Sequence, residues 1–212
     1  MSYKPVVITQ TEQIRKMANE KQVGREHFQS DLLDNGKMSR VLDAIRDGGR
    51  IMIGAPLVVP PGCRIERVTV EVQLDQGWQA AVNAAGPNTP ETHNVRKVGD
   101  LYLPTGTDVV KEELILLNYA KGDGNWDKAL AWADQFRLRK TDPRRVFAIG
   151  KARPNFNTEV GINPTYVVAT KECSFGDYRR ACSVWWNVSK REASLVWVSR
   201  YGNADAWFAF RE

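Results

Sequence analysis

The residues GDGNWDK, at 122–128, have the oxygen spacing of a calcium-binding loop, with Asp123, Asn125 and Asp127 at alternate positions. Such a loop requires glycine at its sixth position and glutamate at its twelfth, but Lys128 and Asp134 stand there. Asparagine and aspartate are also strong helix N-caps. The pattern therefore predicts the beginning of a helix near residue 125 and no metal site.

The residues that could carry catalysis are few. His27 and His93 lie far apart and in no known motif, so we interpret each as a structural or surface histidine. Cys63, Cys173 and Cys182 match no zinc spacing, and an odd number cannot all pair within the chain. We interpret them as reduced structural thiols, although Cys173 and Cys182 could lie on neighbouring strands and form a disulfide. The sequence predicts no catalytic residues, no metal and no cofactor.

Aromatic residues instead dominate the end of the chain, residues 185–212, WWNVSKREASLVWVSRYGNADAWFAFRE. In SLVWVSR and AWFAFR the large residues recur every second position, which is the period of a β-strand. One face of each strand would pack and the other would face outward. The predicted apolar framework is Trp185, Trp186, Leu195, Trp197, Trp207, Phe208 and Phe210.

This segment resembles the variable region of diversity-generating retroelement target proteins, which end in a C-type-lectin-like fold. In that family, reverse transcription randomises adenines, mostly in asparagine codons, at the 3′ end of the gene. A parent such as REANLNW…WFAFR would become the REASLVW…WFAFR of this chain, with Ser194 and Val196 at the asparagine positions. The resemblance covers residues 185–212 closely and the preceding hundred residues only in general organisation. It implies a variable region at about 178–212.

The resemblance also implies the residues that would contact a ligand. They are Ser194, Val196, Val198, Ser199, Arg200, Tyr201, Asn203, Ala204, Asp205 and Ala206. Randomising the adenines of an AAC codon cannot produce Lys, Glu, Gln, Met or Trp, and none of these residue types occurs at those positions. We expect the ten residues to form one exposed patch above Trp197, Trp207, Phe208 and Phe210. The implied function is non-catalytic binding of a protein or another macromolecule.

Two other interpretations stay open. Tryptophan-rich terminal strands also occur in β-rich domains without a binding role, so a structural or assembly protein of similar fold is the alternative. Formylglycine-generating enzymes share the C-type-lectin-like fold and use paired cysteines, but the spacing and surroundings of Cys173 and Cys182 do not match theirs. That enzyme class is the third interpretation.

Charge and length constrain the partners and the compartment. The 212 residues suit one domain, with or without a small N-terminal appendage, and the net charge is +5. The basic residues, such as those at 137–140, Arg144, Arg145, Arg179 and Arg180, are dispersed, so we interpret them as solvated surface and expect no specific nucleic-acid binding. We find neither a membrane span nor a signal peptide and expect a cytoplasmic protein. Display on a surface or phage particle would leave no mark on the sequence.

The predicted elements make an α+β chain, with a C-type-lectin-like domain at 50–212 and a helical appendage at 1–49. Helices are expected within 9–47, including one at about 30–47, and at about 125–136. Residues 83–93 are expected to form an exposed loop. Strands are expected at 50–59, 64–74, 101–103, 112–118, 145–150, 165–170 and around 207–211.

Overall fold

The computed structural model describes residues 57–202 and 204–212. The chain divides into Met1–Gly54 and Ala55–Glu212, and the described residues belong to the second unit. The helices predicted at 9–47 lie outside them, as does most of the strand predicted at 50–59, whose described residues 57–59 form no strand. The elements are β1 (Cys63–Gln73), α4 (Trp78–Ala85), the 3-10 helix η2 (Asn94–Leu101), β2 (Val109–Tyr119), α5 (Trp126–Gln135), β3 (Arg139–Lys140), α6 (Pro143–Ala152), α7 (Phe156–Val160), β4 (Thr165–Ala169), β5 (Cys173–Phe175), β6 (Tyr178–Asn187), β7 (Lys190–Trp197), the 3-10 helix η3 (Val198–Arg200) and β8 (Ala206–Arg211).

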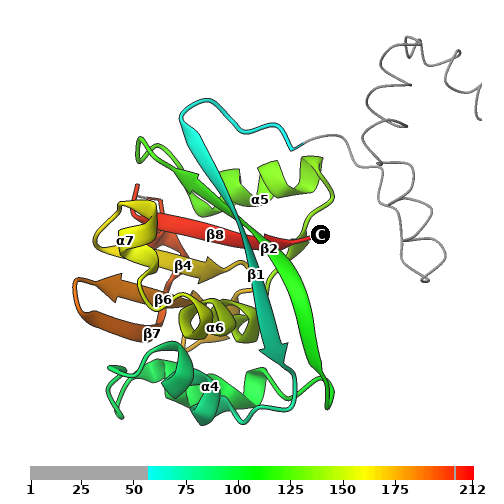
Figure 1. Ribbon diagram of the computed structural model, residues 1–212, viewed down its shortest axis with the longest axis vertical. Coiled ribbons are helices and arrows are strands. Elements are labelled where there is room, and N and C mark those ends of the chain that lie inside the picture. Colours follow the sequence, from blue (N-terminus) through cyan, green and yellow to red (C-terminus); the bar gives the residue numbers. More distant parts are fainter. Residues whose placement is uncertain (1–56, 203) are drawn as a thin grey trace, which may run out of the picture. The chain divides into compact units, whose positions relative to one another are not determined.

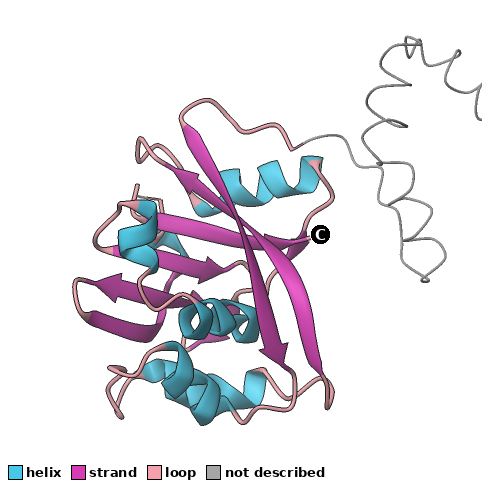
Figure 2. Ribbon diagram, viewed as in Figure 1, coloured by secondary structure: helices cyan, strands magenta, loops and turns pink. Residues whose placement is uncertain are grey.

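The strands form one eight-stranded sheet in the order β1-β2-β8-β4-β6-β5, with β3 pairing to β8 and β7 pairing to β6. The last strand, β8, lies in the middle of this sheet, antiparallel to β2 and parallel to β4 (Figure 1). The prediction that the C-terminal strand pairs inside a sheet is therefore confirmed. Figure 2 shows the helices packed around these strands, so the prediction of an α+β chain is confirmed as well.

Two hydrophobic cores cover the two faces of the sheet. Along β2, Leu114 and Leu116 belong to the core that includes α4, α6 and α7, whereas Ile115 and Leu117 belong to the core that includes α5. Because successive side chains of a strand point to opposite faces, these two sets mark opposite faces. Strand β8 alternates in the same way, so the expectation that one of its faces looks outward is wrong. A strand in the centre of the sheet with helices on both sides has no outward face.

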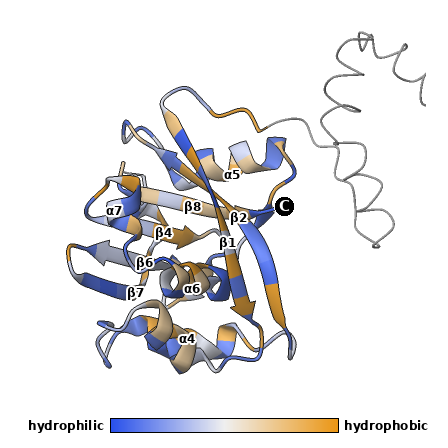
Figure 3. Ribbon diagram, in the orientation of Figure 1, coloured by the Kyte–Doolittle hydropathy of each residue, from blue (hydrophilic) through white to orange (hydrophobic). Residues whose placement is uncertain are grey.

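Several predicted elements are confirmed. Strand β1 covers residues 64–73 of the strand predicted at 64–74, and its Val68, Val70 and Val72 are buried while the residues between them are exposed. Figure 3 shows that this strand carries both apolar and polar residues. Helix α5 begins where it was expected. The Asn125 side chain caps it by accepting a hydrogen bond from the backbone N–H of Lys128 at 2.8 Å. Asn125 is thus a helix cap, as predicted from the sequence.

Three predictions of secondary structure are wrong. Residues 145–150 lie in helix α6, which begins with the cap Asp142 and with Pro143 in its first turn. A proline directly after an N-cap is typical of a helix start, but the apolar run that follows was interpreted as a buried strand. Leu101 ends the 3-10 helix η2 and is not part of a strand. Residues 83–85 belong to helix α4, so the loop expected at 83–93 begins only at Gly86.

The interpretation of Arg144 and Arg145 as solvated surface is also wrong, since both are buried. Arg144 donates to the backbone carbonyl oxygens of Tyr102, at 2.8 Å, and of Gln76. Arg145 binds both oxygens of Glu112, at 2.5 and 2.6 Å, and its pKa is raised mainly by this contact. The two arginines tie helix α6 to neighbouring segments, because a buried guanidinium needs carbonyl or carboxylate partners.

Candidate functional site

A hollow of about 500 Å³ opens beside β7 and the segment that connects it to β8. We call it the β7 hollow. Its lining residues are His93, Tyr166, Arg180, Trp185, Glu192, Ser194, Leu195, Val196, Trp197, Arg200, Tyr201 and Asp205. Five of them, Ser194, Val196, Arg200, Tyr201 and Asp205, are among the ten ligand-contacting residues that the family resemblance implies. The structure therefore brings half of that set together at one place.

Strand register builds one side of the hollow. Tyr166 on β4 pairs with Trp185 on β6, and Trp185 pairs with Glu192 on β7. Residues directly opposite each other in a sheet project to the same face, so these three side chains form a row. The rings of Tyr166 and Trp185 lie 6.2 Å apart with 30° between their planes. One row along, Ser183 and Ser194 are paired. The row therefore consists of two aromatic rings followed by the carboxylate of Glu192.

Tyr201 anchors the segment that closes the hollow. Its side chain is only 3% exposed, and its hydroxyl donates to Ser183 Oγ at 2.9 Å. Burial raises the pKa of this phenol well above its ordinary value, so it stays neutral. Its ring lies edge-on to that of Tyr166, 6.1 Å away. The expectation that Tyr201 is an exposed contact residue is wrong, because the ring belongs to the core beneath the hollow.

The other nine predicted contact residues fall into four groups. Val198 and Ala206 are buried in the core that contains α5, which contradicts their predicted exposure. Ser199 and Arg200 are exposed, while Ser194, Val196, Ala204 and Asp205 are half-buried. Asn203 lies outside the described residues. Ser194 and Val196 lie on the face of β7 opposite Leu195, as alternation predicted, but they are half-buried rather than exposed. Alternation could not follow the chain through η3, where the period changes.

Trp197 is more exposed than predicted. It was expected beneath the patch with Trp207, Phe208 and Phe210, but it is 45% exposed whereas those three are buried. It is the last residue of β7. Its ring packs beside that of Tyr178 at 5.8 Å, and the Arg180 guanidinium lies 5.5 Å from its ring centroid. Trp197 is therefore an accessible aromatic residue at the edge of the hollow.

Two backbone anchors hold the segment before β8 in place. The buried Asn118 of β2 donates from Nδ2 to the carbonyl oxygens of Ala204 and Ala206, at 2.8 and 2.9 Å. Thr165 donates from its hydroxyl to the carbonyl oxygen of Asp205 at 2.9 Å. These contacts fix the backbone that carries Asp205, so the position of its carboxylate depends on buried residues of β2 and β4.

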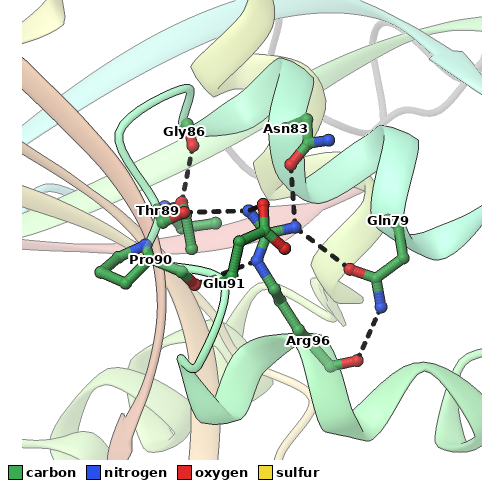
Figure 4. Close-up of polar contacts among 8 residues, drawn as sticks. Gln79, Asn83, Gly86, Thr89, Pro90, Glu91 and Arg96 are labelled. Atoms are coloured by element: carbon green, nitrogen blue, oxygen red, sulfur yellow. Dashed lines mark hydrogen bonds and ion pairs between the residues drawn. The ribbon is translucent and has the colours of Figure 1, made fainter.

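The loop at 86–93 seats His93 against β7. A Cβ atom at Gly86 would lie 2.1 Å from the backbone nitrogen of Ala193, so only glycine permits this close approach. Thr89 accepts from the same nitrogen at 2.7 Å and donates to the Gly86 carbonyl oxygen at 2.6 Å. Arg96 donates to the carbonyl oxygens of Thr89 and Pro90, and to the Gln79 and Asn83 side chains (Figure 4). The guanidinium thus clamps the loop to α4.

The hydrogen bonds of His93 determine what it can do. Its Nδ1 accepts from the backbone N–H of Val95 at 3.1 Å, so the ring proton resides on Nε2. Nε2 lies 3.4 Å from Ser194 Oγ and can only donate to it. A general base for a serine nucleophile needs a free lone pair facing the hydroxyl. His93 therefore positions Ser194 and caps η2, in agreement with the interpretation that it is a structural histidine.

The charges around the hollow are of both signs. Burial raises the pKa of Asp205 above its ordinary value, and burial lowers that of His93. The pKa of Tyr166 is raised first by burial and then by Asp205 and Glu192, while Arg200 acts in the opposite direction. The two carboxylates and the Arg200 guanidinium are therefore close enough to influence one tyrosine.

Comparison with known proteins gives no match to a family model, to a curated protein or to a solved structure. Within the part of the chain that the structure describes, the three cysteines are unpaired and no group of three His, Cys, Asp or Glu side chains could hold a metal ion. No helix of residues 57–202 and 204–212 is long and apolar enough to cross a membrane.

No sequence pattern pointed to Tyr166 and Glu192 as site residues, and His93 was interpreted as a structural or surface histidine. Trp185 was predicted to belong to the framework, and it is half-buried and lines the hollow. The pairing of β4 with β6 and of β6 with β7 makes Tyr166, Trp185 and Glu192 neighbours, and the loop at 86–93 brings His93 to them.

Proposed function

We propose that this protein is a non-enzymatic ligand-binding protein and that the β7 hollow is its binding site. The proposal includes a C-type-lectin-like scaffold whose contact residues are diversified by a retroelement. One observation carries it: five residues implied by the family resemblance converge on one hollow, although they are spread over β7, η3 and the segment before β8.

The division between support and contact residues also favours binding. Tyr201, Val198 and Ala206 are buried and anchor the segment, while Ser194, Val196, Ser199, Arg200 and Asp205 retain exposed surface. Substitutions at partly exposed positions usually change stability by no more than about 0.5 kcal/mol, so such positions tolerate diversification. Binding sites typically combine adaptable polar residues with rigid aromatic ones. The hollow offers both.

The chemistry of the hollow favours a protein ligand over a nucleic acid. Aromatic rings and charges of both signs suit the mixed surface of a protein. Glu192 and Asp205 would repel phosphate groups, which normally require a concentration of positive charge. The His93–Ser194 pair lacks the free base nitrogen that hydrolysis requires, which supports a non-catalytic role.

A structural or assembly protein is the second candidate, and one observation favours it. Tyr178 and Trp197 are exposed by 59% and 45% and form an aromatic pair at the end of β6 and β7. Exposed aromatic residues that lie together are typical of surfaces that a partner covers. A permanent assembly would form without a variable ligand, so the experiments below separate the two functions.

The binding proposal can be tested with a peptide library displayed on phage. The full chain serves as bait, and each enriched peptide is measured against Ser194→Tyr, which fills the hollow, and Thr69→Tyr, a control at an exposed position of β1. We expect peptides that bind the wild type and the control but lose at least about tenfold in affinity for Ser194→Tyr. Peptides that bind all three proteins equally, or no enrichment, would contradict binding in the hollow. Circular dichroism shows whether each variant is folded.

The diversification proposal is tested on the surrounding DNA. We expect a reverse-transcriptase gene nearby and a near-copy of the 3′ end of this gene that differs only at adenines. The differences should fall in the codons of the ten predicted residues. If both are absent, the protein is not a retroelement target, and the binding proposal then depends on the hollow alone.

A further inference from the structure

We propose that the β7 hollow binds a cationic side chain, the guanidinium or ammonium group of an arginine or lysine on a protein ligand. The group would lie over the rings of Tyr166 and Trp185, between the carboxylates of Glu192 and Asp205. This inference rests on the proposed function and specifies the ligand chemistry of the same site.

The aromatic row provides the surface for a cation. Tyr166 and Trp185 are both half-buried and line the hollow, with 30° between their ring planes. A cation within about 6 Å of such rings is attracted by their electron-rich faces, and tryptophan attracts it most strongly. Trp185, Tyr166 and Glu192 are not among the predicted diversified positions. This part of the hollow would therefore stay constant while the residues around it change.

The two carboxylates provide uncompensated negative charge. Both line the hollow and both are half-buried. None of the ion pairs among residues 57–202 and 204–212 involves Glu192 or Asp205. Burial destabilises the charged carboxylate of Asp205 and raises its pKa, and a hydrogen bond from its own backbone N–H offsets only part of this effect. A ligand cation would supply the missing partner.

The protein's own cations do not fill this role. The His93 ring next to Glu192 has a lowered pKa and is neutral at pH 7. The Arg180 guanidinium lies over the rings of Phe175 and Trp197, 5.4 and 5.5 Å from their centroids. Arg200 is exposed and forms no ion pair with either carboxylate. Because Arg200 also lines the hollow, its charge would compete with that of an incoming cation.

This arrangement predicts that removing a carboxylate and removing the Arg200 charge change the affinity for a cation in opposite directions. Removing negative charge with Glu192→Gln or Asp205→Asn should weaken the binding of a cation, because each substitution takes away one partner. Removing the competing charge with Arg200→Ala should strengthen it. An anionic ligand would reverse all three effects, and an uncharged ligand would be insensitive to them.

The experiment uses N-acetyl-L-arginine methylamide as the probe and N-acetyl-L-citrulline methylamide, nearly the same shape without the charge, as its control. Binding to the full chain is followed by NMR through the indole N–H signal of Trp185, which the substitution Trp185→Phe identifies. We expect saturable shifts with the arginine probe and about tenfold weaker binding of citrulline. Glu192→Gln should weaken binding about twofold to fivefold, while Arg200→Ala should tighten it at least about twofold. Glu66→Gln, at an exposed position of β1, is the matched control and should have no effect.

The outcomes separate the inference from the proposed function. Equal binding of arginine and citrulline, no effect of Glu192→Gln, or weaker binding by Arg200→Ala would overturn the cationic ligand. The cationic ligand would also be wrong if the arginine probe caused no shift while phage peptides without lysine or arginine bound the wild type but not Ser194→Tyr. In that case the proposed function would still hold. If neither the probes nor any displayed peptide binds in the hollow, the proposed function itself is wrong.

Discussion

The hydrogen bond between Tyr201 and Ser183 offers the sharpest test of how the binding segment is supported. Tyr201→Phe removes only the hydroxyl, so the ring contacts with Tyr166 and Trp126 are kept. Ser183 is fully buried and would lose the one side-chain partner that the structure shows for its hydroxyl. Leaving a buried polar group unpaired costs about 1–3 kcal/mol, so the free energy of unfolding should fall by that amount.

The double-mutant cycle separates this hydrogen bond from other effects. Ser183→Ala alone strands the buried phenol and should cost about 1–3 kcal/mol for the same reason. When both hydroxyls are absent, neither group is left unpaired. The double variant should therefore be about 1 kcal/mol more stable than the sum of the two single effects predicts.

The assay is urea denaturation followed by tryptophan fluorescence, with the dependence on urea concentration compared between variants. Ser199→Ala is the control, because Ser199 is exposed and its substitution should change stability by no more than about 0.5 kcal/mol. If Tyr201→Phe behaves like this control, or if the two single effects are additive within about 0.5 kcal/mol, the hydroxyls do not stabilise each other. Tyr201 would then not be the anchor that the geometry indicates.

Three further predictions concern Asn118, Glu112 and His93. Asn118→Leu removes the side-chain amide that donates to the carbonyl oxygens of Ala204 and Ala206. Because these two carbonyls lose a partner, the free energy of unfolding measured in urea should fall by about 1–3 kcal/mol. An unchanged midpoint would contradict the anchoring role. Glu112→Gln removes one of the two carboxylates that hold the guanidinium of Arg145 and leaves Asp142 as the other, so calorimetry should show a loss of about 1–3 kcal/mol in stability; an unchanged stability would mean that Asp142 alone is sufficient. Burial lowers the pKa of His93 in the folded state, so the unfolded chain takes up the proton first as the pH falls. The contribution of neutral His93 to stability is therefore complete above about pH 6.5 and is lost below it. The free energy of unfolding of the wild type should decrease more between pH 7 and 5 than that of His93→Gln. Parallel plots of this free energy against pH would refute the prediction.

Local pattern predicted the elements whose environment repeats along the chain. Strand β1 was found because it has one buried and one exposed face, so Val68, Val70 and Val72 alternate with polar residues. Helix α5 was found because Asn125 is an intrinsic helix cap. Helix α6 was mistaken for a strand, because a segment buried on most sides loses the periodicity that distinguishes the two.

The candidate site shows the same limit. The alternation of Ser194 and Val196 with Leu195 was sufficient to predict that Ser194 and Val196 face away from the core that contains Leu195, α4 and α6. It could not predict that Tyr201 turns inward, since its partner Ser183 lies on another strand. Nor could it predict that Trp197 is accessible, because the position of β7 in the sheet is set by pairing with a distant segment of the sequence, β6.

The sequence by itself determined the aromatic C-terminal strand, the α+β composition and the stretch of chain that reaches the hollow. These follow from residue type and from short-range periodicity, which do not depend on distant segments. Tertiary structure alone decided that Tyr166, Trp185 and Glu192 form a row, that His93 reaches Ser194, and that Glu192 and Asp205 both line the hollow. Such neighbours are set by strand register and loop packing, and these depend on the free energy of the whole fold rather than on any local segment.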